Sequence, residues 1–228
     1  TLFLSYNRRL ESERFPIRNF FLRRFFRIAP MYYIGIIYYL FQNGLGPNYW
    51  LGDHTHISLL NILSNFTFSH GFNPYWINSL VPGGWSIAVE MTFYAILPIL
   101  FLKIKNINHA LNFLIFSVVS SFLLNLILHH YPLISCERLW GQYLFFYFPN
   151  QLPIFALGIL MYYILYKNNN DTSMISGKTL LILSLCLFIQ LVMNREDIFQ
   201  RHLQFGICFL FLGIGLSRYN LVFFVNPV

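Results

Sequence analysis

Charged residues are scarce in this chain. Aspartate, glutamate, lysine and arginine make up 10% of its 228 residues, whereas a soluble domain usually carries about 25%. Hydrophobic residues make up 57% and aromatic residues 20%. This balance excludes intrinsic disorder, and one soluble core could not hide so many apolar side chains. The composition therefore predicts a membrane protein whose chain crosses the bilayer several times.

Cysteines and the common cofactor motifs are also scarce. Only three cysteines occur, without paired spacing or a metal-binding pattern: Cys136, Cys186 and Cys208. Cys186 and Cys208 lie inside apolar runs, so we expect buried, unreactive thiols. There is no phosphate-binding loop, no Gly-x-Ser-x-Gly and no zinc motif. The segment Asp53-His54-Thr55-His56 has no third ligand at an obvious distance. We therefore expect no metal site and no bound cofactor.

Long apolar runs dominate what is present. Six of them approach the roughly 17–25 residues that a crossing helix needs, at 28–44, 85–102, 110–129, 151–166, 178–193 and 203–217. The first is short, and Pro30 stands near its first turn, where proline is best tolerated. We predict an all-α fold, a transmembrane bundle of about six spanning helices.

The positions of lysine and arginine predict the orientation of this bundle. If residues 1–27 are cytoplasmic, alternate loops place twelve of the fifteen lysines and arginines on the cytoplasmic side, as the positive-inside rule requires. The formal net charge of +7 is thus explained by topology and does not indicate a nucleic-acid partner. We expect a multi-pass protein of the inner (plasma) membrane, in contact with membrane lipids.

Two segments differ from simple spans. Residues 57–69 place polar side chains on one helical face and apolar ones on the other; the polar positions are Ser58, Asn61, Asn65 and Ser69. We expect an amphipathic helix on the outer membrane surface or against the bundle. Residues 143–149 form an aromatic cluster, which is either an interfacial belt or the wall of a cleft.

Polar side chains inside the apolar runs are the first candidates for function. Glu90 lies in the second run, where an unpaired carboxylate costs a few kcal/mol, and Ser86 projects from the same face one turn earlier. The pair is either a structural anchor or an acid–base or substrate-binding group in a polar cavity. A stripe in the third run predicts either hydrogen bonds between helices or the lining of a polar tunnel: Ser117, Ser121, Asn125 and His129.

An arginine cluster precedes the first run. Arg24 and Arg27 are three residues apart and share a helical face, beside Arg23. Two guanidiniums on one face can hold the phosphates of a cytosolic donor. The alternative is that the cluster serves only topology and contact with lipid phosphates.

Three stretches of the chain form recognisable motifs. Residues 20–30 contain Arg-x-x-Arg before Ile-Ala-Pro, residues 84–94 read Gly-Trp-Ser-Ile-Ala-Val-Glu-Met-Thr-Phe-Tyr, and residues 149–158 contain Leu-Pro-Ile-Phe-Ala-Leu-Gly. In order and spacing, over nearly the whole chain, they resemble the integral-membrane acyltransferase 3 family, which includes sugar and lipopolysaccharide O-acetylases. The second motif is the most specific of the three.

The resemblance implies one membrane-embedded acyltransferase domain over residues 1–228. It implies acyl-CoA, most often acetyl-CoA, as co-substrate and a hydroxyl of an envelope carbohydrate or glycolipid as acceptor. Glu90 is then the catalytic candidate, and the substrate-binding candidates are Arg23, Arg24, Arg27, Trp85 and Ser86.

One departure from the family pattern concerns the catalytic histidine. The family places it in a first helix, and no histidine of this chain occupies the matching place; we assign the role to none of His54, His56 and His70. Because the chain starts at Thr1 and stops without a tail, we expect a piece that lacks first and last helices and is inactive alone.

Two rival functions stay open at this point. A transporter or flippase for an envelope glycolipid or a small polar solute would use Glu90 and the polar stripe as a path, and a membrane scaffold would need neither. We favour the membrane acyltransferase, because a pure scaffold has little reason to keep buried charge.

Overall fold

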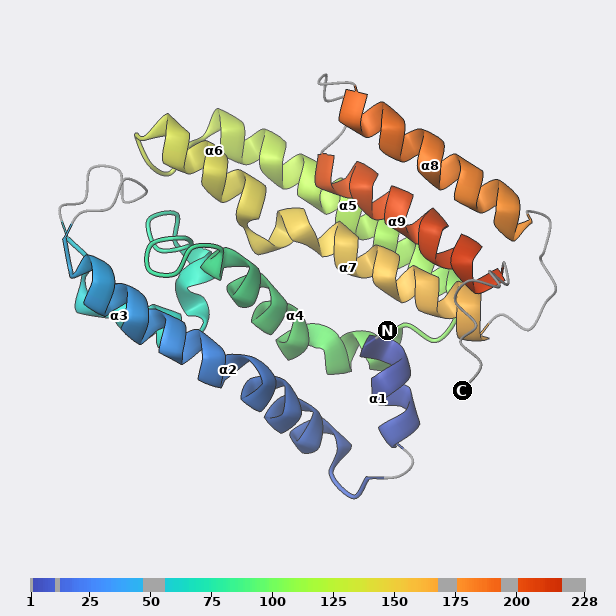
Figure 1. Ribbon diagram of the computed structural model, residues 1–228, viewed down its shortest axis with the longest axis horizontal. Coiled ribbons are helices and arrows are strands. Elements are labelled where there is room, and N and C mark those ends of the chain that lie inside the picture. Colours follow the sequence, from blue (N-terminus) through green and yellow to red (C-terminus); the bar gives the residue numbers. More distant parts are fainter. Residues whose placement is uncertain (1, 11–12, 47–55, 168–175, 194–200, 219–228) are drawn as a thin grey trace. The chain divides into compact units, whose positions relative to one another are not determined.

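Helices form most of the described part of the chain. A computed structural model describes residues 2–10, 13–46, 56–167, 176–193 and 201–218 (Figure 1). Within these ranges no strand occurs, and the elements in chain order are α1 (Leu2–Leu10), α2 (Pro16–Asn43), α3 (Leu59–Phe66), the 3-10 helix η2 (Ser69–Phe72), α4 (Gly84–Lys103), α5 (Ile107–His130), α6 (Glu137–Phe146), α7 (Phe148–Tyr162), the π-helical turn η3 (Tyr163–Lys167), α8 (Gly177–Met193) and α9 (Arg201–Arg218). The predicted all-α fold is confirmed.

Among the described residues, three helical stretches are long and apolar enough to cross a membrane: Gly84–Lys103, Ile107–His130 and Glu137–Tyr166. The shorter α8 is also apolar. Apart from Gly44 at the end of the first run, the predicted runs fall within helix, and the number of six spans stays a prediction. Phe41 on α2 is 92% exposed, and much of the exposed surface of α5 is likewise isoleucine, leucine and phenylalanine. Apolar surface of this extent fits lipid and not water.

The predicted start of the first run is wrong. α2 begins at Pro16 instead of residue 28, with the proline in its first turn, where the missing N–H costs nothing. Pro30 therefore lies inside the helix rather than near its start. As a result, the arginine cluster forms part of the same continuous helix as the apolar run.

The described chain separates into two compact units, whose boundaries fall within α1, α5 and α7 and before the last residue of α4. One unit holds residues 1–4, 103–117 and 153–228, and the other holds residues 5–102 and 118–152. The prediction of one domain over residues 1–228 stays a prediction.

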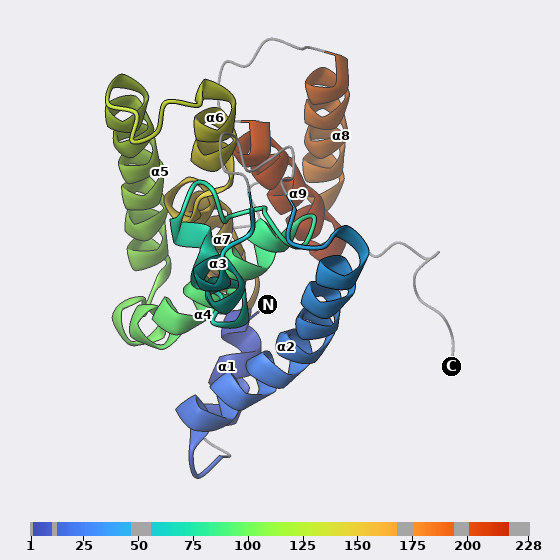
Figure 2. The same cartoon turned by 90° about the vertical axis from the view of Figure 1, so that its left-hand side faces the viewer.

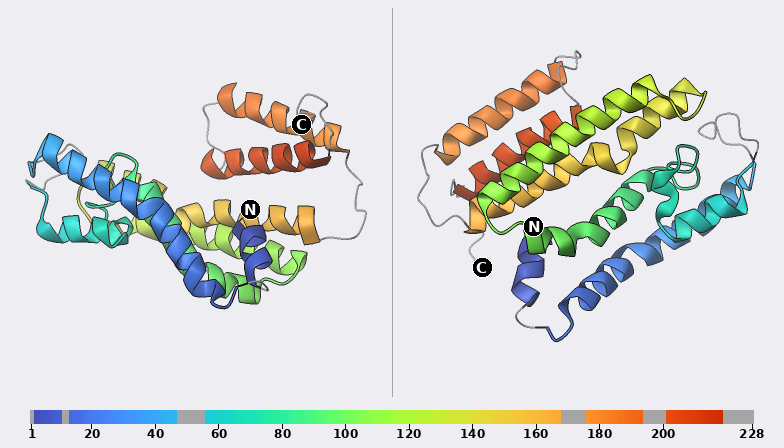
Figure 3. Two further views of the ribbon diagram at one scale, coloured as in Figure 1. Left: turned by 60° about the horizontal axis from the view of Figure 1, so that its bottom comes forward. Right: turned by 180° about the vertical axis from the view of Figure 1, so that it is seen from behind.

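In the first unit, α8 and α9 pack side by side as a hairpin (Figure 3). The Ser184 hydroxyl donates to the Cys208 carbonyl at 3.0 Å, and the Cys208 thiol donates to the Ser184 carbonyl at 3.2 Å. Cys208 is buried, as predicted, whereas Cys186 is exposed. The expectation of a buried Cys186 is wrong because this residue lies on the outer face of the hairpin.

In the second unit, α3 packs with its polar face inward. Asn61 and Asn65 are 1% exposed, whereas Leu59 and Leu60 on the opposite face are 70% and 66% exposed. The Tyr33 hydroxyl donates to the carbonyl oxygen of Phe66, the last residue of α3, at 2.7 Å. Of the two placements that the sequence left open for residues 57–69, the contacts show the helix packed against α2. It is also shorter than predicted and is followed by η2.

A second polar cluster joins α5 to the start of α7. Ser121 Oγ and Asn125 Nδ2 both donate to Asn150 Oδ1, at 3.0 and 2.9 Å. Trp140 on α6 donates to the Leu128 carbonyl at 2.8 Å, so that α6 lies beside α5 (Figure 2). Within the polar stripe, Ser121 and Asn125 therefore form hydrogen bonds between helices, and His129 is exposed. The arrangement matches the structural alternative for this stripe.

Replacing Asn150 with alanine is expected to destabilise the protein by about 1–3 kcal/mol, because Ser121 and Asn125 would lose their shared acceptor. Thermal unfolding in detergent micelles measures the effect. Asn108→Ala is the control, since Asn108 is an exposed asparagine on α5. Equal unfolding midpoints for the two variants would show that the cluster contributes nothing to stability.

Candidate active site

The helices α2 and α4 pack antiparallel in the second unit. The Arg24 guanidinium lies over the Tyr94 ring, 5.3 Å from its centroid, about halfway along α4. Just before the start of α4, the Val81 side chain lies 3.8 Å from the position of a Cβ added to Gly35. This register places the arginine cluster beside the end of the Trp-Ser-Ile-Ala-Val-Glu motif that carries the acidic residue.

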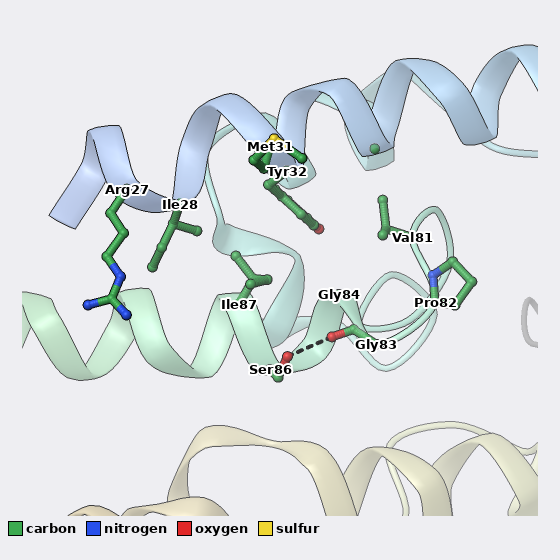
Figure 4. Close-up of a pocket in the computed structure, with 11 residues that line it drawn as sticks. Arg27, Ile28, Met31, Tyr32, Val81, Pro82, Gly83, Gly84, Ser86 and Ile87 are labelled. Atoms are coloured by element: carbon green, nitrogen blue, oxygen red, sulfur yellow. Dashed lines mark hydrogen bonds between the residues drawn. The ribbon is translucent and has the colours of Figure 1, made fainter. Parts of the chain in front are cut away.

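An open groove of about 540 Å³ runs between the two helices (Figure 4). Arg27 stands at one end and extends its guanidinium from α2 towards α4. Ser86 and Gly83 lie at the other end, where the Ser86 hydroxyl donates to the Gly83 carbonyl at 2.8 Å. Apolar side chains form most of the walls between these ends: Ile28, Met31, Val81, Pro82 and Ile87. The groove therefore suits an elongated, mostly uncharged ligand with an anionic end.

A second cavity, of about 260 Å³, collects the arginines. Its lining residues come from α1 and α2 and are Ser5, Tyr6, Arg9, Phe20, Arg23, Arg24 and Arg27. Arg27 lines both this arginine cavity and the groove. Four guanidiniums around one small space create a strongly positive site, which suits an anion with several charges.

The arginines differ in the interactions that they form within the protein. Arg23 donates from Nη1 to both carboxylate oxygens of Glu13, at 2.8 and 3.0 Å, and this hydrogen bond lowers the pKa of Glu13 below its ordinary value. Arg24 rests on the rings of Phe20 and Tyr94. Within the described residues, neither Arg24 nor Arg27 forms an ion pair or a hydrogen bond. Arg24 and Arg27 are therefore available to bind a ligand, whereas Arg23 is already paired with Glu13.

Glu90 lies close to this arginine segment. Its carboxylate accepts a hydrogen bond from the Tyr94 hydroxyl, one turn further along α4, and Arg24 covers the ring of the same tyrosine. The register of α2 against α4 produces this proximity, because Arg24 on α2 lies opposite Tyr94, one turn after Glu90 on α4.

Trp85 packs against an aromatic core instead of lining the groove. Its ring stacks on Phe146 with the centroids 4.4 Å apart, at the edge of a core that includes Trp140 and Tyr147. Trp85 is not among the groove residues, whereas its neighbour Ser86 is. Of the predicted substrate-binding residues, the structure thus gathers Arg27 and Ser86 in one groove and Arg23 and Arg24 in the adjoining cavity.

Sequence reasoning missed a set of hydrogen-bonded residues next to the groove. Tyr32 Oη donates to Asn65 Oδ1 at 2.8 Å and lies 3.1 Å from His70 Nε2, which is 3.0 Å from the Gly84 carbonyl oxygen. Asn65 was visible as part of the polar face of residues 57–69. Tyr32 and His70 gave no signal, since a tyrosine at the start of an apolar run indicates an interfacial anchor.

No group of three histidine, cysteine or carboxylate side chains able to hold a metal occurs among the described residues. The segment from Asp53 to Thr55 lies outside them, and His56 is exposed. The arrangement is an arginine-lined cavity next to a largely apolar groove, with Arg27 lining both.

Comparison with known proteins identifies one family. The model of the acyltransferase 3 family, described as an acyltransferase domain, matches residues 2–224, a range that contains every helix from α1 to α9. No curated protein and no solved structure shows significant similarity to the chain.

Proposed function

Because the chain belongs to the acyltransferase 3 family and is a membrane acyltransferase, we propose that it moves an acyl group from acyl-CoA to a hydroxyl of a carbohydrate or glycolipid of the cell envelope. We further propose acetyl as the acyl group. The observation that carries the proposal is that Arg27 lines both a four-arginine cavity and a largely apolar groove.

Charge and shape support acyl-CoA as the donor. The phosphates of coenzyme A suit the arginine cavity, where Arg24 and Arg27 have no competing ion pair among the described residues. The uncharged arm that carries the thioester suits the groove. From Arg27 to Gly35 the α2 wall is about 12 Å long at 1.5 Å per residue, so that an arm extending from the phosphates could reach towards Ser86.

The proposed chemistry is attack of the acceptor oxygen on the thioester carbonyl. The acceptor hydroxyl gives its proton to a general base, a C–O bond forms, the C–S bond breaks, and coenzyme A leaves as the thiol. The family resemblance assigns that base to a histidine in the first helix of the family. Glu90 stays our candidate for a catalytic carboxylate, and it accepts a hydrogen bond from the Tyr94 hydroxyl.

The proposed orientation fits the location of the donor. With residues 1–27 on the cytoplasmic side of the inner membrane, the arginine cavity faces the compartment that contains acyl-CoA. The acceptor would approach from within or beyond the bilayer.

Release of free thiol from acetyl-CoA tests the proposal. The full-length protein in detergent or nanodiscs, given acetyl-CoA and an extract of envelope glycolipid, is expected to release coenzyme A in step with the appearance of labelled acetyl groups in the glycolipid. Movement of unmodified glycolipid across liposomes without thiol release would favour a transporter instead. Thiol release without any label in the carbohydrate or lipid fraction would contradict the proposed acceptor.

A further inference from the structure

A continuous chain of hydrogen bonds connects α2 with the start of α4, the two helices that form the walls of the groove. Tyr32 on α2 donates to Asn65 on α3, and the Asn65 amide donates to Asn61 Oδ1 at 3.1 Å. Ser79, in the turn before α4, donates to the same Asn61 oxygen at 2.8 Å. His70 Nε2 completes the path from Tyr32 to the Gly84 carbonyl, the first residue of α4.

The protonation of His70 follows from its neighbours. His70 is 0% exposed, and burial lowers the pKa of its imidazole, so that the ring is neutral at pH 7. The Gly84 carbonyl can only accept a hydrogen bond, and Tyr32 already donates its proton to Asn65. A ring proton on Nε2 therefore satisfies the Gly84 carbonyl and lies beside Tyr32 Oη.

Tyr32 and Gly84 are also lining residues of the groove (Figure 4). In the figure the Tyr32 side chain extends from α2 towards the start of α4. A Cβ added to Gly84 would lie 2.9 Å from Tyr32 Oη. The contact is therefore close enough to fix the separation of α2 and α4 at this end of the groove.

We propose that Tyr32 and His70 are positioning residues that set the width of the groove by tying α2 to the first turn of α4. The same turn leads into Ser86 and Glu90, so the tie also sets their position relative to Arg27. The effect on activity rests on the function proposed above, whereas the effect on groove width does not.

A crosslink across the groove measures the width directly. Gly35→Cys with Val81→Cys places two thiols across from each other, because the Gly35 Cβ position lies 3.8 Å from a Val81 methyl group. Cys136 and Cys186 are replaced with serine in this background. We expect Tyr32→Phe and His70→Ala to slow disulfide formation at least about threefold. His70→Gln, which keeps an N–H donor near the position of Nε2, is expected to restore the rate. Tyr33→Phe is the matched control, since the Tyr33 hydroxyl donates to the Phe66 carbonyl and, within the described residues, to no member of the Tyr32–His70 network.

Acyl transfer by the same four variants without the cysteine pair is the second readout. Misplacement of the reacting groups predicts a fall in kcat of about 10- to 100-fold for Tyr32→Phe, with the KM for acetyl-CoA unchanged. Crosslinking at the parental rate in both Tyr32→Phe and His70→Ala would overturn the proposal, whatever the activity. Slower crosslinking with full activity would support the proposed effect of these residues on groove width. It would contradict the proposal that acyl transfer takes place in the groove. Tyr32→Phe keeps the aromatic ring, so the test does not depend on the folding of His70→Ala.

Discussion

Alanine at both Arg24 and Arg27 is expected to reduce acyl transfer at least about 100-fold. Charge-assisted hydrogen bonds contribute about 1.5–3 kcal/mol each, so the loss of two would weaken donor binding by about 100- to 10,000-fold. Both side chains line the arginine cavity, and neither forms an ion pair or hydrogen bond within the described residues. The effect is expected in the KM for acetyl-CoA, and label incorporation into the envelope glycolipid measures it.

A matched double variant separates this specific effect from loss of positive charge. Arg14 and Arg18 belong to the same arginine-rich segment, stack on Phe15 and lie outside the cavity. Arg14→Ala with Arg18→Ala removes the same charge and should keep at least about half of the activity. Lysine at positions 24 and 27 should give an intermediate activity, because it keeps the charge without the bidentate geometry. Equal losses in the two alanine pairs would contradict a phosphate-binding role and favour a role in topology.

Alanine at Gly71 is expected to destabilise the protein by about 1–3 kcal/mol. The added Cβ would lie 2.7 Å from the Cβ of Ala88, closer than two carbon atoms can approach. Both atoms are fixed to backbone, so relief requires η2 and α4 to separate. Such a shift would also disturb the His70 contact with Gly84, since Gly71 follows His70 directly. Thermal unfolding in detergent micelles is the measurement.

Two further variants test whether this contact is the cause. Gly141 on α6 has open space at its Cβ position, so Gly141→Ala should be neutral or stabilising by up to about 1 kcal/mol. Ala88→Gly in the Gly71→Ala background removes the opposing methyl group and should recover part of the lost stability, although glycine within α4 itself costs about 1 kcal/mol. If the rescue variant is no more stable than Gly71→Ala alone, the close contact does not explain the destabilisation.

Local patterns predicted the helices well. The runs at 85–102, 110–129 and 178–193 differ from α4, α5 and α8 by three residues or fewer at each end, because apolar length is a property of the local sequence. The start of α2 was predicted wrongly. The change from arginines to apolar residues was interpreted as the start of a helix, but one helix continues through that change.

The candidate site was likewise predicted only in part from the sequence. Arg24 and Arg27 share a helical face by spacing alone, and the structure places both in one cavity. Their relation to Glu90 depends on how α2 and α4 pack, and spacing along one helix contains no information about that register. Trp85 and Ser86 are adjacent in sequence, but α4 directs one towards Phe146 and the other towards the groove.

By itself, the sequence determined a membrane-embedded helical protein of the acyltransferase 3 type with an arginine pair on one face, because composition, apolar length and motif spacing are local. Only the tertiary structure decided that α3 turns its polar face inward, that Tyr32 and His70 join the walls of a groove, and that Glu90 lies beside the arginines. The physical reason is that hydrogen bonds and ring contacts between separate helices depend on their packing and register, which no single segment specifies.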